Sequence, residues 1–206
     1  MTNLANKVIA NLYEIEAIQI KPDRSFTWTS GIKSPIYCDN RLTMSYPKVR
    51  KQITQGFVEK LQSCLEEIDV IAGCATAGIP HAAWLADALN IPMAYVRGKA
   101  KAHGKGNQIE GVIKQGDKVV VIEDLISTGG SVLETVKAIE AVGAKVIVVL
   151  AIFSYGLKKS VEAFNEVTID YHTLADFDLL IKFLLANHEI TDAEADDLLE
   201  WRDQLG

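Results

Sequence analysis

The chain has 206 residues, of which 49% are hydrophobic and 23% are charged, and this composition excludes predominant disorder. No apolar run approaches the ~20 residues of a membrane-spanning helix, and the N-terminal residues, Glu14 and Glu16 among them, lack the apolar stretch of a signal peptide. The net charge of −6 lies in the segment from Glu189 to the C-terminus, so the neutral remainder has no basic excess and we expect no nucleic-acid partner and no membrane association.

The N-terminal part is predicted to contain two helices separated by a small hood. Apolar residues fall on one helical stripe over residues 4–18. In residues 26–39, aromatic and β-branched residues alternate around a Ser-Gly pair, and Pro35 limits strand pairing, which predicts short strands around a turn. Residues 47–61 form the second predicted helix, with Ser45 as its candidate N-cap.

Beyond residue 69, short apolar segments alternate with helical segments. The predicted strands are 70–73, 92–96, 118–122, 146–152 and 167–169. The predicted helices are 79–89, 131–142, one beginning near Thr173 and one opening with the capping-box pattern Thr191-Asp192-Ala193-Glu194, and residues 98–110 form a polar, glycine-rich loop. Continuously apolar strands separated by helices predict a parallel sheet that is covered on both faces.

We therefore expect a doubly wound α/β fold with a mostly parallel sheet. The sequence predicts a single domain over residues 1–206, with an N-terminal helix and hood over 1–45 and an acidic C-terminal helix over 190–206. Cys38, Cys64 and Cys74 are widely spaced and odd in number, which argues against a disulfide framework or a zinc site. This cysteine usage fits a reducing, cytoplasmic location.

The segment VVVIEDLISTGGS, residues 119–131, carries the strongest chemical signal. Glu123 and Asp124 follow branched apolar residues and are expected at the carboxyl end of their strand, where ligands bind in open α/β sheets. The small polar residues 127–131 then lead into a helix, and backbone N–H groups at a helix N-terminus form an anion site. The segment lacks the lysine of a Walker A loop, and its acids precede the loop, unlike those of a dinucleotide-binding fingerprint. A phosphate loop beside two carboxylates suits a sugar phosphate with bound Mg²⁺, whereas the alternative is an ordinary strand–turn–helix joint.

The same segment resembles the phosphoribosyl-pyrophosphate (PRPP) motif of type I phosphoribosyltransferases. Three more segments narrow the resemblance to orotate phosphoribosyltransferases. FTWTSGIKSPIYCDNR (26–41) resembles their orotate-side hood, GCATAGIPHAAWLA (73–86) their pyrophosphate-side loop, and YVRGKAKAHGKGNQIEG (95–111) their mobile catalytic loop. The resemblance implies the type I fold and transfer of the phosphoribosyl group from PRPP to orotate. The implied products are orotidine 5′-monophosphate (OMP) and pyrophosphate, formed with Mg²⁺ in pyrimidine biosynthesis.

The resemblance also implies roles for individual residues. Those implied as catalytic are Lys101, His103 and Asp124. Those implied to bind PRPP are Arg97, Lys101, His103, Glu123, Asp124, Leu125, Ile126, Ser127, Thr128, Gly129, Gly130 and Ser131. Those implied to bind orotate are Ser127 and Tyr37. No metal ligand of the protein is implied, because PRPP would hold most of the Mg²⁺ shell, and a homodimer is implied in which loop residues 97–105 serve the partner subunit's site.

Several residues depart from the family pattern or receive a structural interpretation. The positions where other members carry lysine or arginine are Thr29, Ala77, Gly98 and Tyr155. These departures remove cations around an anionic base and a polyanionic leaving group. We interpret His81 as a structural histidine, Trp28 as hood packing and Cys74 as without a chemical role.

Two alternative functions stay open. A phosphoribosyltransferase for a purine or uracil would share the PRPP motif, although the hood disfavours it. A regulator that senses PRPP while binding nucleic acid would keep the fold, although the neutral core, the acidic C-terminus and the intact loop disfavour it.

Overall fold

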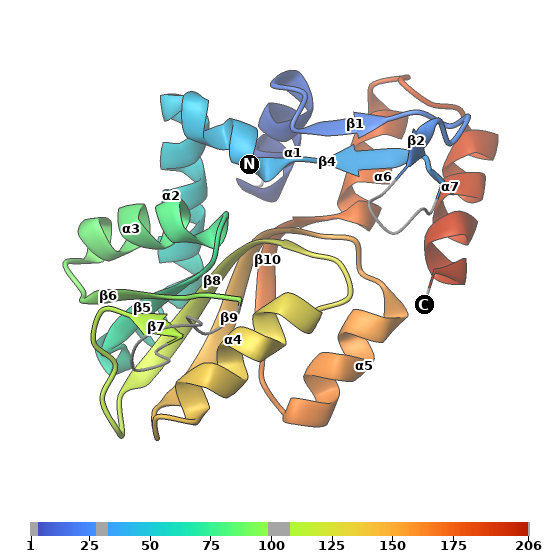
Figure 1. Cartoon of the computed structure of the whole chain (residues 1–206). Helices are drawn as coiled ribbons and strands as arrows, with labels where there is room; N and C mark the ends of the chain where they lie inside the picture. The colour runs from blue at the N-terminus through green and yellow to red at the C-terminus, as the bar shows by residue number, and fades with distance from the viewer. Residues whose placement is uncertain (1–3, 28–32, 99–107, 206) are drawn as a thin grey trace.

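The computed structural model describes residues 4–27, 33–98 and 108–205. Its centre is a six-stranded sheet in the order β10-β9-β8-β5-β6-β7 (Figure 1). The strands are β5 (Val70–Cys74), β6 (Met93–Val96), β7 (Ile109–Glu110), β8 (Lys118–Ile126), β9 (Lys145–Ser154) and β10 (Tyr171–Asp176). Every neighbouring pair is parallel except β6 with β7. The predicted α/β fold with a mostly parallel sheet is confirmed.

The strand order contains a topological switch point between β5 and β8. From β5 the chain moves outward to β6 and β7, and it then returns to β8 on the other side of β5 and continues outward to β9 and β10. The connections after β5 and β8 therefore leave in opposite directions. Ligands of open α/β sheets bind at the carboxyl ends of the strands at such a point.

Helices cover both faces of the sheet. The helices are α1 (Leu4–Glu14), α2 (Pro47–Leu61), α3 (Gly78–Leu89), α4 (Gly130–Glu140), α5 (Lys158–Val167), α6 (Phe177–Ala186) and α7 (Asp192–Gln204), and α7 lies beside the hood rather than on the sheet. Figure 1 shows α4 and α5 in front of the sheet. In the part of the chain that the structure describes, no helix is long and apolar enough to cross a membrane.

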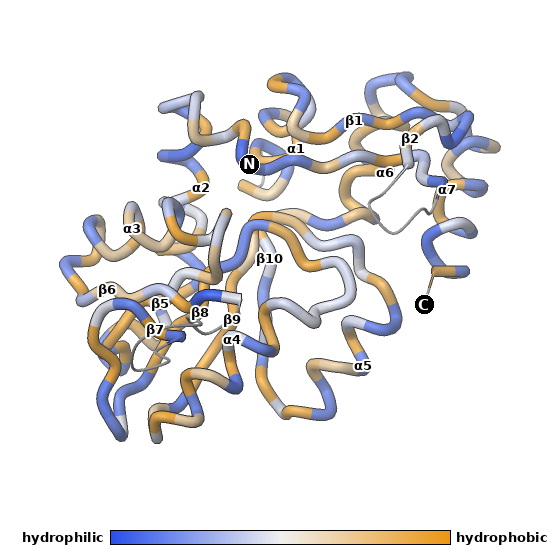
Figure 2. The backbone as a smooth tube through the Cα atoms, viewed as in Figure 1, coloured by the Kyte–Doolittle hydropathy of each residue, from blue (hydrophilic) through white to orange (hydrophobic). Residues whose placement is uncertain are grey.

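Strand β8 contributes side chains to two hydrophobic cores, one on each face of the sheet, because its side chains alternate between the two faces. Val120 and Ile122 belong to a core shared with α1, α2, α3 and α6, whereas Val119 and Val121 belong to a second core shared with α4. All four side chains are fully buried. Figure 2 shows the central strands as mainly hydrophobic, which explains why this segment reads as a continuous apolar run.

The N-terminal hood lies over the end of the sheet where β5 and β8 finish (Figure 1). Its elements are β1 (Ile18–Ile20), β2 (Phe26–Thr27), β3 (Lys33–Ser34), β4 (Ile36–Cys38) and the 3-10 helix η1 (Asn40–Ser45). β1 pairs with β4 and β2 pairs with β3, both antiparallel, so the predicted short strands are confirmed. An ion pair of 2.7 Å between Arg24 and Asp197 links the hood to α7.

Two predicted helix ends are wrong. α1 ends at Glu14, because Glu16 adopts a φ of 57° and the chain then enters β1. Ser45 is not the N-cap of α2, since Tyr46 occupies that position and Pro47 opens the helix. The predicted capping box of α7 is confirmed, with the side chains of Thr191 and Glu194 each accepting a hydrogen bond from the other residue's backbone N–H.

The prediction for residues 167–176 is also wrong. The expected strand 167–169 is the end of α5 and the turn after it, where Thr168 adopts a φ of 55° and ends the helix. The helix expected from near Thr173 begins only at Phe177, because residues 171–176 form β10 and pair with β9. Local β-branched residues indicated a strand four residues too early, and the true strand is fixed by pairing with a distant segment.

Candidate active site

A cleft of about 390 Å³ lies at the switch point, between the sheet and the hood. Its lining residues are Cys38, Asp39, Arg41, Ala75, Thr76, Ala77, Glu123, Asp124, Leu125 and Ser131. Hollows of similar volume lie beside α1 and beside the turn into α7, away from the carboxyl ends of β5 and β8. The cleft is therefore distinguished by its residues and its place in the fold rather than by its volume.

The two acids of the motif meet in this cleft. They lie inside β8 rather than beyond its end, because the strand continues to Ile126. Glu123 is only 6% exposed and accepts a hydrogen bond of 2.9 Å from the backbone N–H of Asp124. Burial, and then the neighbouring Asp124, raise the pKa of Glu123 well above its usual range, and burial also raises the pKa of Asp124. Such a pair resists carrying two charges until a hydroxyl donor or a cation arrives.

The segment after the acids forms the N-terminus of α4. Gly129 has a φ of 82°, a conformation that favours glycine, and it provides no side-chain cap. The first N–H groups of an α-helix have no partner within the helix, so this end is open to an anion. Thr128, Gly130 and Ser131 are exposed, Ser127 is half-buried, and the Ile126 side chain is buried in the core. Ile126 can therefore offer a ligand only its backbone.

The loop after β5 forms the opposite wall of the cleft. Ala75, Thr76 and Ala77 line it, and none of them is charged. Gly78 then opens α3, where an added Cβ would lie 2.3 Å from the carbonyl oxygen of Ile122 in β8. The glycine thus lets the start of α3 approach β8 closely and holds this loop beside the acid pair.

The hood contributes a polar run that the sequence reasoning did not single out, Asp39-Asn40-Arg41. Arg41 donates two hydrogen bonds to the Asp39 carboxylate, at 2.6 and 2.8 Å. Asn40 is fully buried, and its Nδ2 donates to the backbone oxygen of Asp124 at 2.7 Å. The sequence signals for these residues were a change from apolar to polar at the end of a short hood strand and their place at the end of the hood segment 26–41.

Tyr37 lies in β4 of the same hood, next to Cys38, and is not among the lining residues of the cleft. Its ring is 40% exposed and stacks on Phe26 with a centroid distance of 5.7 Å. An exposed aromatic face that is already supported by a second ring suits a planar base.

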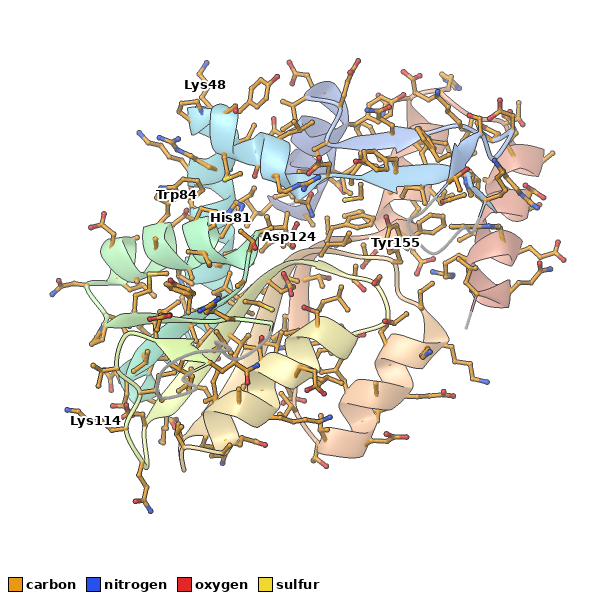
Figure 3. The ribbon with its side chains drawn as sticks, in the orientation of Figure 1. Lys48, His81, Trp84, Lys114, Asp124 and Tyr155 are labelled. Atoms are coloured by element: carbon orange, nitrogen blue, oxygen red, sulfur yellow. The ribbon has the colours of Figure 1, made fainter. Side chains whose placement is uncertain are left out.

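Two other site predictions fall behind or beside the cleft. Tyr155 is 3% exposed and packs edge-on against Phe153, and burial raises its pKa well above the usual value (Figure 3). Arg97 is not among the lining residues, and its guanidinium lies 3.7 Å from the Glu110 carboxylate. Lys101, His103, Trp28 and Thr29 lie outside the described residues.

His81 and Cys74 have structural surroundings. His81 is 1% exposed, its Nε2 lies 3.2 Å from Oγ1 of Thr43, and burial lowers its pKa to about 4 (Figure 3). Cys74 is 2% exposed with its Sγ 3.1 Å from Oγ1 of Thr135, and burial raises the pKa of its thiol to about 12. Both groups are thus neutral near pH 7, which fits the structural interpretation of each.

Comparison with known proteins agrees with this geometry. Residues 46–178 match the family model of the phosphoribosyl transferase domain. The chain is 55% identical to an orotate phosphoribosyltransferase of Oceanobacillus iheyensis, over 97% of this chain and 98% of the relative, and 56% identical to one of Bacillus pumilus, over 97% and 94%. The solved orotate phosphoribosyltransferase of Aeropyrum pernix superposes with a TM-score of 0.77 at 26% identity, over 86% of this chain and 97% of that one. A central, mostly parallel sheet with an acid pair and an open helix N-terminus at its switch point, together with these relatives, shows that the chain belongs to the phosphoribosyltransferase family and, within it, to the orotate phosphoribosyltransferases.

Proposed function

We propose that the cleft binds PRPP and orotate and transfers the 5-phosphoribosyl group to orotate, giving OMP and pyrophosphate in pyrimidine biosynthesis. The observation that carries this is the continuous run from the acid pair, Glu123 and Asp124, to the open N-terminus of α4. One end of PRPP is a phosphate and the middle is a ribose with two free hydroxyls. A helix N-terminus and two carboxyl groups on consecutive residues match these parts in order.

In the reaction, the bond between C1′ of the ribose and the pyrophosphate oxygen breaks, and a bond from C1′ to N1 of orotate forms. Pyrophosphate leaves with the bonding electrons, and the proton of N1 is released. Positive charge develops on the ribose ring, and the carboxylate of Asp124 stabilises that charge. Residues 127–131 hold the 5-phosphate, Leu125 lines the cleft, and Ile126 contributes only its backbone. Arg97, Lys101 and His103 neutralise the departing pyrophosphate, and Tyr37 and Ser127 contact orotate.

The residues of the cleft fit a Mg²⁺ ion carried by the substrate. Over the described ranges, no group of three or more Asp, Glu, His or Cys side chains is placed to hold a metal. One or two carboxylates together with substrate phosphate oxygens are the usual shell of Mg²⁺. Glu123 and Asp124 would supply those carboxylates, and the bound ion would add positive charge beside the pyrophosphate.

The proposal includes a homodimer and a cytoplasmic enzyme. Loop residues 97–105 of one subunit would serve the site of the other, as the family resemblance implies. Arg97 supports this, because it lies just after β6 at the start of the loop and is not among the lining residues of its own subunit's cleft.

The test is pyrophosphate release with PRPP and a panel of bases, namely orotate, uracil, adenine and hypoxanthine, each with and without Mg²⁺. We expect release with orotate that depends on Mg²⁺ and on Asp124. A purine or uracil as the preferred base would identify a different phosphoribosyltransferase. No release with any base, combined with tight PRPP binding, would identify a PRPP sensor instead.

A further inference from the structure

We infer that Arg41 recognises the carboxylate of orotate and so selects this base, an inference that rests on the proposed function. Orotate differs from uracil by one carboxylate, so a site that distinguishes them needs a cation or strong donors beside that group. Among the described residues that line the cleft, Arg41 is the only one with a cationic side chain. Asp39, Glu123 and Asp124 are acidic, and the other six are uncharged.

The positions at which other family members carry a cation do not supply one here. Ala77 lines the cleft with a methyl group. Tyr155 is a buried phenol whose pKa is raised by burial, so it carries no charge. Arg97 is a cation, but it is not among the lining residues, and its guanidinium lies 3.7 Å from the Glu110 carboxylate. These observations leave the recognition of the carboxylate to Arg41 within the part of the cleft that the structure describes.

The geometry of Arg41 suits this task. Its side chain is 62% exposed, and it is held by Asp39 through Nε and Nη2. A guanidinium has five N–H donors in a fixed plane, so the Nη1 edge keeps its donors for a ligand. The backbone N–H of Arg41 also donates to Asp39 at 3.2 Å, which holds both residues in one turn. Asp39 thus orients the donor without occupying all of it.

Arg41 also lies at the right place along the substrate. The carboxylate of orotate is attached to the carbon next to N1, and N1 is the atom that bonds to the ribose. The carboxylate must therefore lie between Tyr37, which contacts the base, and the acids Glu123 and Asp124, which contact the ribose. Burial raises the pKa of Asp124, and the positive charge of Arg41 opposes that rise. The pKa of Arg41 is raised mainly by Asp39, with smaller contributions from Tyr37 and Asp124. The guanidinium is thus within electrostatic reach of both Tyr37 and Asp124.

The experiment compares equilibrium binding of two nucleotides that differ only by the carboxylate, OMP and uridine 5′-monophosphate (UMP). Dissociation constants are measured by calorimetry for the wild type, Arg41→Met, Arg41→Lys and Arg24→Met. Arg24 is a matched control, because it is another exposed hood arginine that pairs with an aspartate, Asp197. Thermal unfolding of each variant checks the fold.

We expect Arg41→Met to weaken OMP binding about 10- to 100-fold, the effect of losing a hydrogen bond to a charged group, with UMP binding unchanged. Arg41→Lys should recover part of the preference, and Arg24→Met should behave as wild type. An equal loss for both nucleotides would place Arg41 on the phosphate or the ribose and overturn the inference, as would no loss for either. A wild-type enzyme that forms no OMP from PRPP and orotate would instead contradict the proposed function.

Discussion

Asp124 illustrates a conflict between activity and stability at a single residue. Its carboxyl group lies next to Glu123 in a partly buried strand; burial raises the pKa of both groups, and Asp124 raises that of Glu123 further. Asp124→Asn should lower kcat about 10²- to 10³-fold, because it removes a charge next to the developing cation. The same change should raise the unfolding free energy at pH 8 by about 1 kcal/mol, because it removes a carboxylate whose ionisation is disfavoured by burial. Initial rates of OMP formation and urea unfolding measure the two effects.

The control for this variant is Asp196→Asn, which removes an exposed carboxylate from α7 and should alter neither quantity by much. If Asp124→Asn turns over orotate at the wild-type rate while folding normally, the assignment of the acid pair to the ribose is wrong. A normal loss of activity without any gain in stability would show that the two carboxyl groups share a proton at pH 8.

The buried ring of His81 should make the stability of the folded protein sensitive to acid. Burial lowers its folded-state pKa to about 4, whereas an unfolded histidine has a pKa of 6.5. The unfolded chain therefore binds a proton first, so the contribution of His81 to stability is fully present above pH 6.5 and is lost as the pH falls toward 4. Between pH 7.5 and 4.5 the loss should be about 2–3 kcal/mol. His81→Gln should remove this part of the pH dependence, as measured by urea unfolding at both values.

His172 is the matched control, because it is an exposed histidine on β10. His172→Gln should leave the pH dependence of unfolding as in the wild type. An unchanged slope in His81→Gln would mean that the buried ring is protonated in the folded state, through a partner that its surroundings do not suggest.

The start of helix α3 predicts a steric effect on the fold. A Cβ at residue 78 would lie 2.3 Å from the backbone oxygen of Ile122, and backbone cannot rotate away as a side chain does. Gly78→Ala should therefore destabilise the protein by about 2–3 kcal/mol or more. Gly98→Ala is the control, because an added Cβ there meets nothing within 4 Å. Equal unfolding midpoints for the two variants in urea would show that α3 is free to move away from β8.

At the level of the proposed dimer, a loop shared between the subunits makes a quantitative prediction. Lys101→Ala and Asp124→Asn are each expected to be nearly inactive. If they are unfolded, mixed in equal amounts and refolded, half of the dimers should be hybrids. Each hybrid has one site with an intact acid pair and an intact loop from across the interface, so about a quarter of the wild-type activity should return. Activity that only averages the two mutants would reject the shared site and leave the PRPP assignment standing.

Local patterns in the sequence were sufficient for the elements that carry the chemistry. The apolar run at residues 119–122 becomes a strand because β-branched side chains suit a sheet buried on both faces, and Thr191 caps α7 because its partner is three residues away. The acid pair and the small residues 127–131 lie close together in the chain, so the motif was visible without any knowledge of distant contacts. These interactions are local, and the sequence contains all of their information.

The tertiary structure settled the features that depend on contacts between distant residues. Asn40 reaches Asp124 across 84 residues of sequence, and this contact brings Arg41 to the acid pair. β10 forms where β9 offers a free edge, although a helix was expected to begin within it. Tyr155 is buried and Arg97 faces Glu110 because of the packing around each, which no spacing in the sequence reveals. Pairing and burial across the chain arise only when the sheet assembles, because they are set by the position of one segment against another.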